Sequence, residues 1–269
     1  MNGRVTIVAQ RIRAGASRPS APSPSSSALG RTLTAEDMLE RAMAARTVSA
    51  RARWARRALA LRSPLDKTTH AMLLRQLYLS CYETRRFDRA HAMALQAIEL
   101  GVLVDVFHQD AARAALGDRN VDAAIVHLRT AARRGPPSRR PFHLWTLGSV
   151  LFLAHRYAEA MGALARAVRW GTSDKPLYRA HLALVRVAAG EHVEDARAII
   201  EELALAPCGR GYGRFVLGHL SYAVGAWDVA RQFLEAFVKR TESARPVLAL
   251  ALEGELQMAR ATLSKMAAN

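Results

Sequence analysis

The chain has 269 residues, of which 51% are hydrophobic and 23% charged, so it has enough apolar side chain to bury the core of one elongated domain or of two compact ones. No stretch approaches the about 18 consecutive apolar residues that cross a membrane, and we expect no membrane insertion. The two cysteines, Cys81 and Cys208, are too few for a disulfide framework and wrongly spaced for a zinc site. Their number favours a reducing compartment, and we expect a cytoplasmic protein.

The net charge of +16 lies unevenly along the chain. Residues 1–62 contain twelve arginines and three acids, whereas residues 63–269 contain 27 basic and 20 acidic residues. Only four of the basic residues are lysines. This bias, together with the many alanines, indicates a GC-rich bacterial genome more than selection for phosphate binding, so the charge is weak evidence for a nucleic-acid partner.

Residues 1–33 are basic, contain no acid and are rich in serine, proline and alanine. The run from Ser17 to Ala28 holds three prolines and small polar side chains, which cannot form a core. We predict that this segment is a disordered tail. An organelle transit peptide has a similar composition, so targeting to an organelle stays open as a minor alternative to the cytoplasm.

From Thr34 onward, apolar residues recur at the three- and four-residue spacing of helices. The segments 35–46 and 49–61 predict a first, divergent helical pair within residues 34–66, with Thr34 as N-cap and Glu36 and Asp37 in the first turn. The prolines after the tail lie where one helical pair would end and the next begin. They are Pro64, Pro136, Pro137, Pro141, Pro176, Pro207 and Pro246.

A short pattern recurs five times, in which an aromatic or aliphatic residue is followed by two variable residues and alanine. The copies are Phe87–Ala90, Val121–Ala124, Tyr157–Ala160, Val193–Ala196 and Trp227–Ala230, at steps of 34, 36, 36 and 34 residues. This spacing predicts a stack of helical pairs, each burying one face against the next. The pairs would begin near residues 71, 105, 141, 177 and 211, and a capping helix interrupted at Gly254 would follow over residues 246–267.

The third copy carries the fullest set of repeat residues. The set is Leu144, Leu147, Gly148, Leu151, Tyr157, Ala160, Leu164 and Ala167. On these residues the chain resembles the tetratricopeptide repeat family, although the second and fourth copies are degenerate. The resemblance implies an all-α, right-handed α-solenoid of five to six helix-turn-helix repeats. Small residues such as Gly148 and Ala160 would lie where the two helices of a pair approach closely.

In the tetratricopeptide repeat family, the first helix of each pair lines a groove that binds a peptide or a helix of a partner protein. Carried over to this sequence, the groove positions are Arg75, Tyr82, Gln109, Arg113, Trp145, Ser149, Tyr178, His181, Tyr212, Phe215, His219 and Tyr222. Aromatic side chains suit this role because they give large contact areas at low entropic cost. Four rings near the groove, Phe142, Phe152, Phe215 and Tyr222, could instead pack between neighbouring helices.

The resemblance favours a non-catalytic adaptor for an unidentified protein or peptide, with no cofactor or metal and with the oligomeric state open. The lysines and asparagines of a chaperone carboxylate clamp are missing at the corresponding positions, and no metalloprotease or phosphate-loop motif occurs. The alternative function is nucleic-acid binding by arginines of the first helical pair and of a later turn. These are Arg46, Arg53, Arg56, Arg57, Arg139 and Arg140.

Overall fold

The computed structural model describes residues 33–268. Within this range all regular secondary structure is helical, as the sequence predicts. The elements are α2 (Ala35–Ala44), α3 (Val48–Leu59), α4 (Lys67–Glu83), α5 (Phe87–Glu99), α6 (Val104–Gly117), α7 (Val121–Arg134), α8 (Arg140–Leu153), α9 (Tyr157–Trp170), α10 (Lys175–Ala188), α11 (Ala196–Leu205), the short 3-10 helix η1 (Pro207–Gly209), α12 (Gly213–Ala223), α13 (Trp227–Glu242), α14 (Pro246–Ala251) and α15 (Glu253–Ala268). The predicted tail lies outside the described residues except for Leu33, which packs against the core of α2 and α3.

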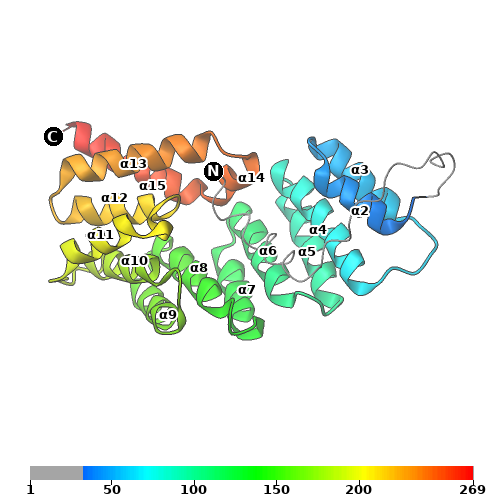
Figure 1. Ribbon diagram of the computed structural model, residues 1–269, viewed down its shortest axis with the longest axis horizontal. Coiled ribbons are helices and arrows are strands. Elements are labelled where there is room, and N and C mark those ends of the chain that lie inside the picture. The colour runs from blue at the N-terminus through cyan, green and yellow to red at the C-terminus, as the bar shows by residue number, and fades with distance from the viewer. Residues whose placement is uncertain (1–32, 269) are drawn as a thin grey trace, which may run out of the picture.

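The helices form an elongated row in chain order, from α2 and α3 at one end to α12 and α13 at the other (Figure 1). From α2 to α13, each helix packs mainly against its sequence neighbours, which is the arrangement of a helical solenoid. The pairs α4–α5, α6–α7, α8–α9, α10–α11 and α12–α13 follow the five predicted repeats. The right-handed sense of the superhelix stays a prediction.

The first pair begins as the sequence predicts. Thr34 is the N-cap of α2, and its side-chain oxygen accepts a hydrogen bond from the Asp37 amide at 3.2 Å. The Asp37 carboxylate in turn accepts from the Thr34 amide at 3.0 Å. This reciprocal pair satisfies donors that would otherwise be left free in the first turn of the helix.

The small residues of the repeats mark the closest contacts within each pair. The five pattern alanines are buried, with at most 3% exposure: Ala90, Ala124, Ala160, Ala196 and Ala230. A Cβ added to Gly148 would lie 2.5 Å from Cγ of Leu164, and one added to Gly218 would lie 2.5 Å from Cγ of Leu234. The predicted close approach of the two helices is therefore confirmed in these pairs.

The turn inside four of the pairs contains a residue in the left-handed backbone region, two positions before the second helix. These residues are Arg85, Arg119, His155 and Gly225, with φ of 55°, 58°, 57° and 79°. The second helix of each of these pairs begins at the first residue of the repeated pattern. The degenerate fourth pair differs, because α11 begins only at Ala196 and the Asp195 carboxylate before it pairs with Arg179 of α10 at 2.6 Å.

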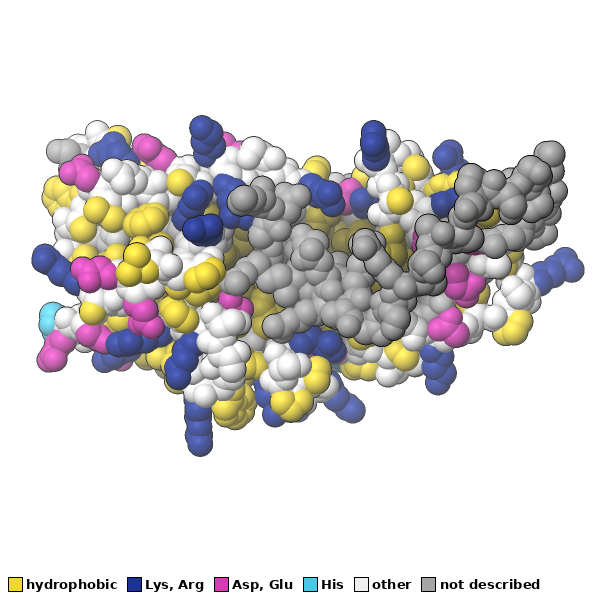
Figure 2. Space-filling view, viewed as in Figure 1, with side chains coloured by type: hydrophobic (Ala, Val, Ile, Leu, Met, Phe, Trp, Pro, Cys, Tyr) yellow, Lys and Arg dark blue, Asp and Glu magenta, His cyan; other side chains and the backbone are white. Residues whose placement is uncertain are grey.

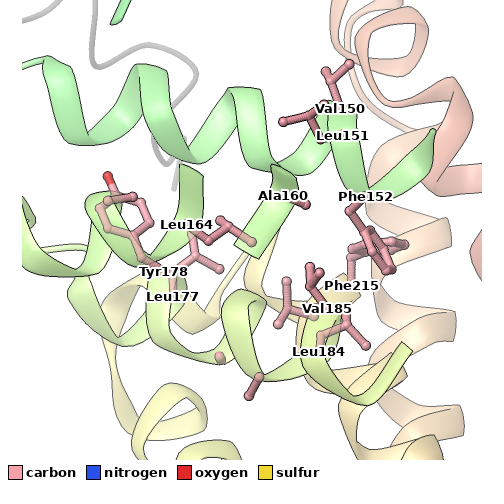
Figure 3. Packing of buried hydrophobic residues seen from close by; sticks show 14 of the residues in the cluster. Val150, Leu151, Phe152, Ala160, Leu164, Leu177, Tyr178, Leu184, Val185 and Phe215 are labelled. Carbon is pink, nitrogen blue, oxygen red and sulfur yellow. The ribbon is translucent and has the colours of Figure 1, made fainter. Parts of the chain in front are cut away.

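The apolar core is continuous through the later repeats. It runs from Ala112 in α6 to Met266 in α15, and Figure 3 shows a part in which side chains of α8, α9, α10 and α12 meet, Phe152 and Phe215 among them. Between α2 and α6, the buried apolar residues form three separate and smaller clusters.

The segment after α13 differs in the place of its break from the capping helix interrupted at Gly254 that the sequence predicts. It forms α14 and α15, and the break falls at Leu252 rather than at Gly254. Gly254 lies inside α15, where an added Cβ would be 3.3 Å from Cδ1 of Leu153, so this glycine permits close contact with α8. Whereas α15 packs on α13 and α12, α14 contacts α4 and α6 of the first two repeats, and Figure 1 shows it in the middle of the row.

Candidate functional site

The first helices of the pairs, α4, α6, α8, α10 and α12, form the surface that we call the inner face, where the sequence places the groove. Seven of the twelve predicted groove residues have at most 5% exposure: Tyr82, Gln109, Ser149, Tyr178, His181, Phe215 and His219. The other five are partly buried: Arg75, Arg113, Trp145, Tyr212 and Tyr222. Phe152 is also buried, so Phe152 and Phe215 pack between helices, as the alternative interpretation of these rings expects.

Aromatic contacts hold the inner helices of the third, fourth and fifth repeats together. The indole Nε1 of Trp145 donates to Nδ1 of His181 at 3.1 Å, and the Trp145 ring meets that of Tyr212 edge-on, 4.8 Å between centroids. The Phe215 ring lies 5.5 Å from Tyr212 and 4.6 Å from His219. Burial lowers the pKa of His181 to about 3 and that of His219 to about 4, so both rings are neutral near pH 7.

A polar cluster joins α15 to the inner face. The hydroxyl groups of Ser149 and Tyr212 lie 2.6 Å apart, and both donate to Oε1 of Glu255, at 3.4 and 3.2 Å. Glu255 is only 6% exposed, and no cation pairs with it among residues 33–268. Burial raises the pKa of Glu255 to about 7. The sequence did not reveal this residue, because its partners lie 43 and 106 positions away.

Two arginines share one carboxylate on the inner face of the first two repeats. Nε of Arg75 lies 2.8 Å from Oδ2 of Asp110, and Nη1 of Arg113 lies 3.3 Å from Oδ1. The Asp110 side chain is 1% exposed, whereas 33% of the Arg113 side chain is exposed. The cluster therefore carries an excess positive charge, and its solvent-facing member is Arg113.

Beside this cluster, α14 lies on an apolar patch. Val247 and Leu250 pack against a cluster that includes Tyr78, Tyr82 and Ala111 of α4 and α6. None of the residues of α14 is fully buried. The inner face of the first two repeats thus holds a short apolar helix of the same chain in a shallow contact.

The predicted basic patch is divided between two places. Arg46, Arg53, Arg56 and Arg57 are exposed on the first helical pair. Arg139 precedes α8 and donates from Nε and Nη2 to the buried Asp105 at 2.7 and 2.9 Å. Arg140 is half-buried at the start of α8, so the two groups do not form one surface (Figure 1).

No helix among residues 33–268 is both long enough and apolar enough to cross a bilayer. A comparison with models of known protein families found no match, and a comparison with curated proteins found none. The assignment to the tetratricopeptide repeat family therefore stays a prediction that rests on the repeat pattern.

Proposed function

We propose that this chain is a non-catalytic adaptor of the tetratricopeptide type, which binds an amphipathic helix of a partner protein on the inner face of its first two repeats. The observation that supports the proposal is α14, which lies on that face although it follows the fifth repeat in sequence. A surface that holds one apolar helix of its own chain has the shape and chemistry to hold another.

The chemistry of this surface defines the ligand. Val247 and Leu250, three positions apart, contact the apolar patch, so a competing helix needs apolar residues at three- or four-residue spacing. The excess charge at Arg113 favours a carboxylate beside these apolar residues, because charge-assisted hydrogen bonds to arginine are strong and directional. We infer an amphipathic helix with an acidic flank.

The shallow seating of α14 is consistent with exchange. Because none of the residues of α14 is buried, the dissociation of α14 would expose less apolar surface than the dissociation of a core helix. A partner helix would have to compete with α14, whose effective concentration at the site is high because both belong to the same chain. Weakening α14 should therefore strengthen binding of the partner.

The test compares four baits in lysate of the native organism, with and without nuclease. The wild-type chain should recover little, a Val247→Asp/Leu250→Asp variant should recover a discrete protein set at least about tenfold better, and adding Arg113→Glu should reverse the gain. The control is Leu205→Asp/Val229→Asp, which introduces the same charges at exposed apolar positions. Equal recovery by all baits would rule out this site, and nuclease-sensitive recovery would favour the exposed arginines of α3.

A further inference from the structure

A cleft on the outer side of the third repeat combines arginines with apolar side chains. On α8, Leu144, Leu147 and Leu151 follow one another at helical spacing on the face opposite Trp145 and Ser149. Above these leucines lie two adjoining cavities of about 280 and 610 Å³ between α7 and α9. The cavities share residues of all three helices, so they form one continuous cleft, which we call the outer trough.

The walls of the outer trough are amphipathic. Val126 of α7 and Trp170 of α9 line the larger cavity, with 59% and 45% exposure. The same cavity is also lined by four arginines, Arg129, Arg133, Arg140 and Arg166. Figure 2 shows Lys and Arg side chains along the lower edge of the molecule, where α7 and α9 lie, with apolar surface between them.

The charges of the outer trough are mostly uncompensated. Arg129 pairs with Glu159, but the described partners of the other three arginines are neutral: oxygens for all three and, for Arg140, also the Trp170 ring, 5.9 Å from its Cζ. Arg133 donates to Thr130 Oγ1 at 3.2 Å, Arg140 to the Gly135 carbonyl at 3.4 Å, and Arg166 to the Gly162 carbonyl at 3.2 Å. In addition, Nε of Arg140 is buried without a hydrogen-bond partner among residues 33–268.

Some arginines elsewhere in the described chain pair with acids, although others, such as Arg214 and Arg231, also donate to backbone carbonyls. Arg75, Arg139 and Arg179 each pair with at least one carboxylate at 3.0 Å or less. The outer trough therefore concentrates three arginines that lack an acidic partner among the described residues, around an apolar floor. A ligand of complementary charge would carry several carboxylates. A bulky apolar side chain between these carboxylates would contact the apolar floor.

We propose that the outer trough is a second docking surface, which binds an acidic segment of a protein through a leucine or an aromatic residue flanked by carboxylates. The larger cavity has the volume of ordinary ligand sites, about 300–1,000 Å³, yet it is open to solvent, as suits a chain segment. A phosphate backbone would satisfy the arginines but leave the exposed side chains of Val126 and Trp170 without an apolar ligand. The outer trough is independent of the inner face.

The probe is a fluorescein-labelled peptide, EEDLFEEDLFEE, added to the purified full-length chain. Arg133→Glu/Arg166→Glu should weaken binding at least about tenfold, whereas Arg89→Glu/Arg197→Glu, the same charge change at exposed positions on α5 and α11, should leave it nearly unchanged. Circular dichroism verifies that both variants are folded. Bound peptide should also change tryptophan emission, and Trp170→Phe should abolish most of that change.

Three results would overturn the proposal. The first is equal affinity of the peptide for the two double variants. The second is equal binding of a control peptide with serine in place of every leucine and phenylalanine, which would show attraction by charge alone. The third is a single-stranded oligonucleotide that binds more tightly than the peptide and loses affinity in Arg133→Glu/Arg166→Glu, which would make the trough a nucleic-acid site.

Discussion

The early helices, α2 to α5, and the later repeats, α6 to α15, build their cores from different residues. Ten of the twelve largest fully buried side chains lie in α6 or later, and only Leu73 and Tyr78 lie in the early helices. The early core relies on alanines such as Ala42, Ala55 and Ala58, which belong to one of its three separate clusters. Because apolar burial contributes about 25 cal/mol per Å², the later repeats should unfold as one unit after the early helices have opened.

The substitution with the largest expected effect on stability removes the Phe215 ring from the continuous core. Phe215→Ala should lower the free energy of unfolding by about 3–5 kcal/mol, because Phe215 has 0% exposure. Hydrogen exchange should then speed up throughout α6 to α15 and little in α4. Leu73→Ala is the counterpart in the early helices, and its effect should stay within α2 to α5. Loss of protection over the whole chain in both variants would contradict the division.

Acid should destabilise the later repeats selectively. Burial lowers the pKa of His181 and His219 below the value of about 6.5 in an unfolded chain. The unfolded state therefore takes up protons first, and stability falls as the pH drops from about 6.5 toward 4. Between pH 7.5 and 5.5 the two residues together should cost about 2–3 kcal/mol, measured by urea titration. His219→Gln should remove about half of this dependence.

The close contact of paired helices can be tested with two glycines of the third repeat. Gly148→Ala should destabilise by about 1–3 kcal/mol, since its new methyl group would overlap Leu164. Gly162→Ala is the matched control, because nothing lies within 4 Å of its added Cβ, and it should stabilise α9 by up to about 1 kcal/mol. Effects of the same sign in thermal melts would refute the close-contact interpretation.

A pH-dependent effect is expected where α15 meets the inner face. Because burial raises the pKa of Glu255 from 4.5 to about 7, the unfolded chain releases this proton near pH 4.5 while the folded chain keeps it up to about pH 7, so stability falls between these two values and stays low above pH 7. Glu255→Gln should therefore stabilise by up to about 3 kcal/mol at pH 8.5 and change little at pH 4.5, measured by denaturant titration. The exposed Glu201→Gln should show no such difference between the two pH values.

The sequence predicts what is local and misses what is long-range. Helix starts, the Thr34 cap and the small residues at pair contacts follow from neighbouring positions, so their patterns are visible in the chain. The burial of His181 and His219 depends on how tightly successive inner helices pack around them, which no repeat position encodes. Glu255 looks like any helical surface residue in sequence, and only the return of α15 to α8 and α12 buries it.

The contact of α14 with the first two repeats has a consequence for the order of events during synthesis. Arg85 and Glu253, which form an ion pair, are 168 positions apart. Translation at about 5–20 residues per second needs roughly ten to thirty seconds to cover that distance. During this interval the inner face of α4 and α6 is made but not yet covered. A ligand that arrives while the chain is on the ribosome meets no competitor there, whereas a later one must displace α14.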